Sequence, residues 1–216
     1  MCNKIKEKFY DIAIRESSDL IKKIKEHPFN VELMNNTLDY EKFKFYLQQD
    51  YLYVTDCTRA LLIIAAKAND IEIMDKLTSV AVGTFATRDY YREHFADCDL
   101  SDNHKKSKSC SAFTDFFMRV AYHNSVAEDF AASYPCFCIY QMVVRHIVES
   151  GIAPNNKYQK WIDFFNTEMI NDVTKIMNKL YEKYSSDEQK NMLEFFHSGL
   201  ELELAFWDEM YYSSLS

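Results

Sequence analysis

Glycine and proline are scarce along this chain, and their scarcity restricts its fold more than any other feature. Only 3 glycines and 3 prolines occur among 216 residues, well below ordinary usage. Because these residues build most tight turns, a chain that lacks them has few turns and long helices. The length suits a single domain over residues 1–216, large enough to bury a substantial core.

Apolar residues recur at helical spacing through most of the chain, and no segment reads as a strand. Breaks in this pattern divide the sequence into about seven helices, over residues 4–25, 40–68, 70–95, 112–130, 135–150, 156–183 and 186–212. Pro28 ends the first of them, Gly151 and Pro154 follow the fifth, and residues 101–111 form the most loop-like stretch. The sequence therefore predicts an all-α fold.

The charge of the chain argues against two classes of partner. The net charge is -8, which does not suit binding to nucleic acid or to an anionic membrane. The basic cluster HKKSK at 104–108 is too short to change that, and we interpret it as a solvated loop. The longest apolar run, ALLIIAA at 60–66, falls far short of the roughly 20 residues that span a bilayer.

The ends and the cysteines of the sequence indicate a cytoplasmic protein. The opening stretch MCNKIKEKFYD lacks the apolar region of a signal peptide. Six cysteines at irregular spacing do not form the pattern of a secreted disulfide framework. We therefore expect the protein to work in the cytoplasm.

The stretch SYPCFCIYQMVV at 133–144 holds two cysteines one residue apart. Proline suits the first turn of a helix, so Pro135 predicts a helix start there. Cys136 would then lie in that first turn, where free N–H groups and the helix dipole favour a thiolate. At about 100° per residue, Cys138 points about 200° away, while Tyr140 lies on the Cys136 side. The two sulfurs therefore cannot bind one metal ion, and either cysteine alone is also compatible with a small core residue.

A second stretch, YLQQDYLYVTDCTRA at 46–60, places a carboxylate among aromatic residues. Asp50, Tyr53 and Cys57 follow helical spacing and share one stripe with Tyr46. Burying a lone carboxylate is expensive. Asp50 must therefore accept a hydrogen bond, for instance from a tyrosine hydroxyl in the core, or serve a ligand.

A third stretch, LELELAFWDEMYY at 200–212, contains a similar carboxylate. Glu201 and Glu203 cannot both face water on a helix whose apolar face includes Leu200 and Trp207. Glu203 shares a stripe with Phe206 and Met210, so we expect it among apolar groups, although a partly solvated glutamate is also compatible with the pattern.

These stretches together resemble the thiaminase II (TenA) family. The resemblance rests on the PC pair with Tyr140 four residues after Cys136, on QDYLY, on YQKWID at 158–163, on ELELAFWDEMYY and on HPFNVELMNNTL at 27–38. The similarity runs from about residue 5 to residue 212 in the order and spacing of that family. It implies a haem-oxygenase-like helical bundle that needs no cofactor or metal and assembles as a homotetramer.

The resemblance also implies an activity and the residues that carry it. Members of the family hydrolyse aminopyrimidines: they split thiamine, or its degradation product aminomethyl-aminopyrimidine, to give hydroxymethylpyrimidine in thiamine salvage. By motif, Cys136 matches the nucleophile, Asp50 the carboxylate that pairs with the pyrimidine, and Glu203 the acid/base group. Three further positions match residues that contact the substrate or the cysteine: Tyr53, Phe206 and Tyr140.

Three positions depart from the family pattern. Phe113 and Phe165 stand where pocket tyrosines are expected, and Asn36 stands where the family usually has glycine. Two missing hydroxyls mean fewer hydrogen bonds to the substrate or to the cysteine, so rate and substrate preference are open. The nucleophile and both carboxylates are present, and the sequence therefore still predicts an active enzyme.

Two other functions remain open from the residues. A haem-oxygenase-like oxidase would need histidine and carboxylate ligands around a common centre, but the neighbours Glu93 and His94 point to different sides, and His146 suits a core position. A non-catalytic helical protein that binds a pyrimidine or a regulatory partner would also fit an acidic, aromatic-rich domain.

Overall fold

The computed structural model describes residues 7–166 and 170–213, and within them the chain is helical with no strand. The elements are α1 (Phe9–Glu16), α2 (Ser18–Lys25), α3 (Pro28–Met34), α4 (Tyr40–Lys67), α5 (Ile71–His94), the short 3-10 helix η1 (Ala96–Cys98), α6 (Lys108–His123), α7 (Val126–Ser150), α8 (Gln159–Phe165), α9 (Ile170–Lys183) and α10 (Ser186–Tyr212). The all-α prediction is confirmed.

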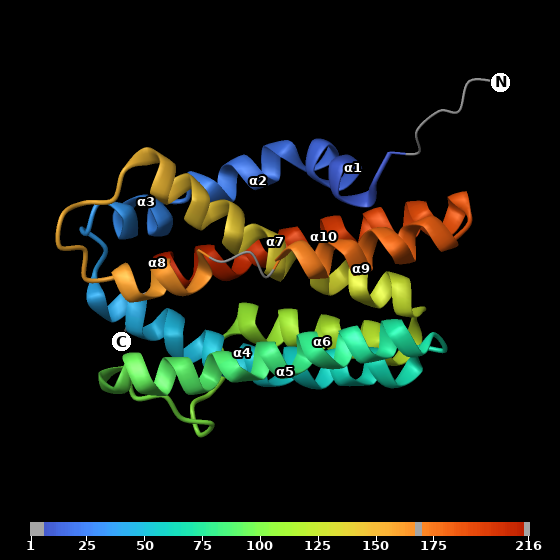
Figure 1. The fold of residues 1–216 in the computed structure, drawn as a ribbon. Helices are drawn as coiled ribbons and strands as arrows, with labels where there is room; N and C mark the ends of the chain where they lie inside the picture. The colour runs from blue at the N-terminus through green and yellow to red at the C-terminus, as the bar shows by residue number, and fades with distance from the viewer. Residues whose placement is uncertain (1–6, 167–169, 214–216) are drawn as a thin grey trace.

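The long helices lie side by side, with α7 and α10 packed against each other through the middle of the bundle (Figure 1). The N-terminal helices α1 to α3 cover one side of this pair, and α4 to α6 cover the other. Both faces of α7 are consequently buried, and its Cys138, Ile139 and Val143 are almost inaccessible to solvent.

Side-chain caps fix where the long helices begin. Asp39 accepts a hydrogen bond from the Glu41 amide at the start of α4, and Asp70 does the same for Glu72 at the start of α5. α7 and α10 each begin with a capping box, in which a serine and a glutamate three residues later bond to each other's amides. These caps satisfy amides that have no partner within the helix.

Several predicted helix boundaries differ from the structure. The first segment is divided at Ser17 into α1 and α2, and Pro28 also opens the short helix α3. The predicted helix over 156–183 comprises α8 and α9 on either side of 167–169. Residues 4–6 and 167–169 lie outside the described part of the chain, so the prediction is not tested there.

The predicted helix start at Pro135 is wrong. Pro135 lies well inside α7, which begins at Val126 behind the capping box of Ser125 and Glu128. An internal proline removes one backbone hydrogen bond of the helix, and here its ring packs against α10. A Cβ atom on Gly199 would lie 2.6 Å from the Ala132 carbonyl oxygen and 2.8 Å from Pro135 Cγ. Glycine at this position therefore allows α7 and α10 to cross closely, one turn before Glu203.

Aromatic rings fill the interior next to that crossing. Tyr46 of α4 stacks on Trp207 of α10, with ring centroids 5.3 Å apart and planes within 9°. Trp161 and Tyr140 close the same cluster from α8 and α7.

Within the described residues, no helix is both long and apolar enough to cross a membrane.

The connection after α3 explains one departure noted in the sequence. Asn36 has a φ of 60°, in the left-handed region that favours glycine. Asparagine is among the residues that tolerate this region best, and the Asn36 side chain also accepts a hydrogen bond from the Lys157 amide. Asparagine can therefore replace glycine there without a change of backbone path.

Candidate active site

A cavity of about 750 Å³ opens between α4, α5, α7, α8 and α9. Five of the predicted site residues line it, and they come from three of these helices: Asp50, Tyr53, Cys136, Tyr140 and Phe165. Cys57, which shares the stripe of Asp50 on α4, lines it as well. The structure thus brings residues far apart in the sequence to one cavity.

Asp50 is the buried carboxyl of this cavity, only 3 % exposed. The Tyr91 hydroxyl donates a hydrogen bond of 2.6 Å to Asp50 Oδ2. Burial raises the pKa of Asp50 to about 7, although the Tyr91 hydrogen bond acts in the opposite direction. The expected hydrogen bond from a tyrosine hydroxyl is therefore present, and the role of Asp50 toward a ligand stays a prediction.

Cys136 has an environment opposite to the one predicted from its sequence. It lies in the middle of α7 rather than in its first turn, so free amides and the helix dipole do not stabilise a thiolate there. Its thiol donates to the Ser133 carbonyl at 2.8 Å. Burial raises the pKa of Cys136 well above its usual range, and contacts with Cys57 and the charge of Glu203 act in the same direction. The nearby Tyr53 hydroxyl lowers this pKa but does not offset the burial. The resting side chain is a thiol.

The orientation of the two neighbouring cysteines agrees with the prediction. Cys136 lines the cavity together with Tyr140. Cys138 is 2 % exposed and its thiol donates to the Pro135 carbonyl. The angle between the two side chains around the helix axis does not depend on where the helix starts, because it follows from the helical repeat alone.

Glu203 is buried behind the cavity, at 1 % exposure, whereas Glu201 faces solvent. Burial raises the pKa of Glu203 well above its usual range, and the nearby Asp50 and Cys57 raise it further. Its Oε1 atom has no hydrogen-bond partner among the described residues, and the same holds for the hydroxyl of Tyr53. Two polar atoms next to the cavity thus remain available to a ligand or to water.

Of the other predicted aromatic residues, Phe113 and Phe206 do not line the cavity but pack behind it, whereas Phe165 lines it. Phe113 packs on Tyr53 with ring centroids 5.0 Å apart, and Phe206 packs on the same ring at 6.2 Å. Phe165 contacts Tyr140 at 4.8 Å and reaches the cavity wall. A hydroxyl on residue 113 would lie in the neighbourhood of Tyr53, whose own hydroxyl has no partner among the described residues.

Sequence reasoning missed Tyr91, the donor to Asp50. Tyr91 belongs to α5, and the sequence shows only a pair of tyrosines at 90 and 91 without saying which of them faces α4. The structure buries Tyr91 completely, while Tyr90 donates to the Lys160 carbonyl at the surface. The sequence did show that Asp50 needs a donor, but it did not reveal which residue supplies it.

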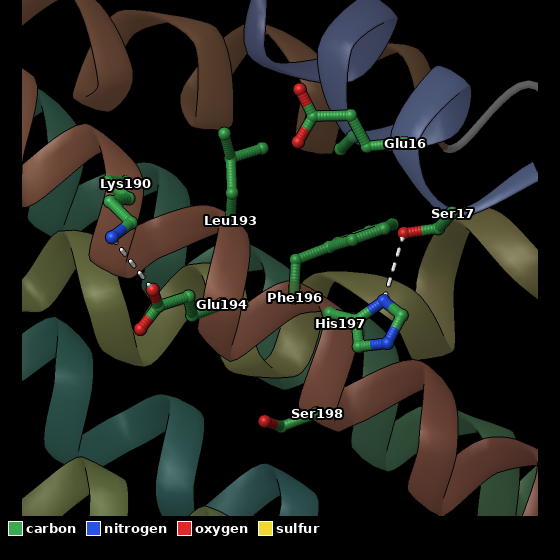
Figure 2. Close-up of a pocket in the computed structure, with 9 residues that line it drawn as sticks. Glu16, Ser17, Lys190, Leu193, Glu194, Phe196, His197 and Ser198 are labelled. Atoms are coloured by element: carbon green, nitrogen blue, oxygen red, sulfur yellow. Dashed lines mark hydrogen bonds and ion pairs between the residues drawn. The ribbon is translucent and has the colours of Figure 1, made fainter.

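A second hollow of about 480 Å³ lies between the junction of α1 and α2 and the outer face of α10 (Figure 2). It includes Glu194 and His197, whose E-x-x-H spacing occurs in di-iron proteins. Here Glu194 forms an ion pair with Lys190, and His197 contacts the Ser17 hydroxyl at 3.4 Å. Within residues 7–166 and 170–213, no three histidine, cysteine or acidic side chains are placed to hold a metal ion together.

Comparisons with known proteins concern the sequence and the fold of the whole chain. The chain is 26 % identical over 196 residues to an aminopyrimidine aminohydrolase of Bacillus subtilis, a match that covers 86 % of this chain and 82 % of the relative. A TenA homologue from P. horikoshii superposes with a TM-score of 0.84 at 28 % identity, over 95 % of this chain and 99 % of that one. A domain of unknown function with a haem-oxygenase-like fold from Shewanella denitrificans gives a TM-score of 0.75 at 10 % identity, over 94 % and 91 % of the two chains, which shows the fold alone. The sequence pattern that defines the TENA/THI-4/PQQC family matches residues 15–214, and the chain belongs to that family.

Proposed function

We propose that this protein is an aminopyrimidine hydrolase, which releases hydroxymethylpyrimidine from thiamine or from its degradation product aminomethyl-aminopyrimidine. One observation carries the proposal: the carboxyl of Asp50 and the thiol of Cys136 face the same cavity, and the carboxyl of Glu203 is buried beside them. The name of the Bacillus subtilis relative supports the same class of substrate.

Asp50 is suited to recognise the aminopyrimidine edge. That edge offers an amino group that donates and a ring nitrogen that accepts, so a carboxyl that keeps its proton can pair with both. A pKa of about 7 leaves a large share of Asp50 protonated at neutral pH. The aromatic rings of Tyr53 and Tyr140 supply flat apolar surface for the pyrimidine.

Cys136 and Glu203 are uncharged in the resting site, and the substrate changes that. Burial keeps both Cys136 and Glu203 protonated in the free protein. Thiamine carries a thiazolium cation, and the aminomethyl compound carries an ammonium group at neutral pH. A cation beside Glu203 lowers the pKa of that carboxyl. We infer that substrate binding releases the Glu203 proton and thereby creates the base that Cys136 needs.

The reaction can then be followed through these three side chains. Glu203 takes the thiol proton, the sulfur of Cys136 bonds to a ring carbon, and Asp50 gives its proton to the adjacent ring nitrogen. The bond to the amine or thiazolium nitrogen breaks, and the leaving group takes the electron pair. Water then adds its hydroxyl to the exposed methylene carbon. The carbon–sulfur bond breaks, Glu203 returns the thiol proton, Asp50 recovers the ring proton, and the remaining proton of water passes to solvent.

A direct assay tests this proposal. The purified protein is incubated with thiamine and with the aminomethyl compound, and hydroxymethylpyrimidine is measured by chromatography. Cys136→Ser should lower turnover by about two orders of magnitude or more, because a serine hydroxyl is much harder to deprotonate. Cys138→Ala is the matched control: it should keep most of the activity and lose about 1 kcal/mol of stability. Pyrimidine binding without any product would instead make the protein a binding module.

A further inference from the structure

The Asp50 carboxyl is held from behind by a residue that takes no part in the reaction proposed above. Tyr91 is fully buried on α5, and its hydroxyl donates to Asp50 Oδ2 at 2.6 Å. Within the described residues, this is the hydrogen bond that the Asp50 side chain accepts. The other carboxyl oxygen, Oδ1, is left for a ligand in the cavity that Asp50 lines.

The proton of a neighbouring tyrosine is directed elsewhere. The indole N–H of Trp161 can only donate, and it donates to the Tyr46 hydroxyl at 3.2 Å. Tyr46 gives its own proton to the Tyr140 hydroxyl at 3.4 Å. Tyr91 is therefore the tyrosine that directs its proton at Asp50.

We propose that Tyr91 is a positioning residue for Asp50: its hydroxyl fixes one carboxyl oxygen and leaves the other directed at the substrate. The consequence for substrate binding rests on the proposed function, whereas the contact itself does not. Because the donor stabilises the charged carboxylate in a dry site, it also sets the pH at which Asp50 loses its proton.

The groups that surround Asp50 leave this effect easy to isolate. Burial raises the pKa of each of them above its ordinary value, so the tyrosines and the cysteine stay uncharged through neutral pH. Glu203 is the one other carboxyl among the described groups that interact with the charge of Asp50, and aspartate-specific labelling separates its titration from that of Asp50. The groups come from five helices: Tyr46 on α4, Tyr91 on α5, Cys110 on α6, Tyr140 on α7 and Glu203 on α10. The cavity is also lined by Lys76 on α5 and by Asp172 and Lys175 on α9.

The test compares Tyr91→Phe with Tyr90→Phe in the ligand-free, full-length protein. Both variants remove one hydroxyl from α5, but Tyr90 bonds to the Lys160 carbonyl rather than to Asp50. The side-chain carboxyl of Asp50 is followed by ¹³C NMR against pH, and its resonance is assigned from its loss in Asp50→Asn. We expect a midpoint near 7 in the wild type and in Tyr90→Phe, and a rise of about one pH unit in Tyr91→Phe. Equal midpoints in the two variants would overturn the proposal.

A second variant protects the test against misfolding of Tyr91→Phe, which circular dichroism would reveal. Tyr91→3-fluorotyrosine keeps the shape of the side chain and its hydroxyl but makes that hydroxyl a stronger donor to Asp50. The Asp50 midpoint should therefore fall below its wild-type value. A midpoint unchanged in this variant would overturn the proposal.

The affinity for hydroxymethylpyrimidine, measured by titration calorimetry across pH, connects the contact to binding. Wild-type affinity should fall about tenfold per pH unit above the Asp50 midpoint, and in Tyr91→Phe this fall should begin at higher pH. If the NMR midpoint moves but no protein binds the pyrimidine, the positioning role stands and the proposed function fails. If the pyrimidine binds but the midpoint does not move, the positioning role of Tyr91 fails and the proposed function stands.

Discussion

At the scale of single residues, the site relies on burial to keep acidic groups protonated. Asp50, Cys136 and Glu203 all have a raised pKa, and in each of them burial is the largest cause. A cluster of neutral acids next to an apolar cavity is less expensive than a cluster of buried charges, and it can still exchange protons when a cationic substrate enters.

Asp50→Asn should make the protein more stable, and the gain should grow with pH. The pKa of Asp50 is about 7 in the folded state, against an ordinary value of 3.8 for an aspartate, so ionisation favours the unfolded chain as the pH rises between these values. At about 1.4 kcal/mol per pH unit, the gain reaches on the order of 4 kcal/mol at most by pH 8 and vanishes near pH 4. Urea unfolding at both values measures it.

Asp115→Asn is the control for this experiment, because Asp115 is exposed and the same chemical change there should be nearly neutral at both pH values. A gain for Asp50→Asn that is the same at pH 4 and pH 8 would show that Asp50 is ionised in the folded protein. In the proposed binding mode the asparagine amide can still donate to the ring nitrogen and accept from the amino group, so pyrimidine binding should remain. Turnover should fall, because an amide cannot give its proton to the ring, so stability and activity are opposed at this position.

At the scale of the helices, composition and periodicity predicted the class but not every boundary. Pro135 was interpreted as a helix start because proline favours first turns, yet the true start at Val126 follows a capping box that the sequence does contain, Ser125 with Glu128. The internal proline is tolerated because its ring packs on Gly199 of α10, and sequence alone cannot reveal such a contact between helices. The predicted orientation of Cys136 was nevertheless correct, since it depends only on the helical repeat.

Gly199→Ala should push α7 and α10 apart and disturb the site between them. The added methyl would meet the Ala132 carbonyl oxygen at 2.6 Å, and backbone cannot move aside cheaply. We expect a loss of about 1–3 kcal/mol in unfolding free energy. Turnover should fall more than in a variant that loses the same stability elsewhere. The reason is that Cys136 follows Pro135 directly and Glu203 lies one turn after Gly199.

Gly151→Ala provides that matched variant. Gly151 ends α7 with a φ of 98°, and nothing lies within 4 Å of its added Cβ, so alanine there costs about 1 kcal/mol through backbone strain alone. Thermal unfolding and turnover are measured for both variants. Equal turnover in the two proteins would show that the close crossing does not position the catalytic groups.

At the scale of the whole molecule, the sequence predicted which face of each helix is buried. It did not predict which helices bury these faces against one another. The stripe of Asp50, Tyr53 and Cys57 was recognised as buried, and the cavity confirms that it faces a common space with Cys136 and Tyr140. The donor Tyr91 could not be identified, because that requires the relative rotation of α4 and α5. Contacts between helices depend on how the complete core packs. The sequence of a single helix therefore does not reveal them.

One residue far from the cavity joins three helices at one end of the bundle. Lys67, the last residue of α4, donates to the Ala121 carbonyl of α6 at 2.9 Å and to Asp129 of α7 at 2.6 Å, and it also reaches the Asn124 carbonyl. The Asp129 side chain is fully buried. Burial raises its pKa to about 6, and Lys67 acts against that rise.

Lys67→Met keeps the aliphatic chain but removes this cation, and it should destabilise the protein by about 3 kcal/mol or more at pH 8. The loss should be smaller at pH 5, because Asp129 is then mostly protonated with or without its partner, and only the hydrogen bonds to the carbonyls are missing. Lys190→Met, which removes an exposed lysine paired with Glu194, should change the stability by less than about 1 kcal/mol at either pH. Urea unfolding of all three proteins at the two pH values measures these differences. A loss for Lys67→Met that is as large at pH 5 as at pH 8 would mean that the lysine acts through the α6 carbonyls alone and that the buried carboxyl of Asp129 does not depend on it.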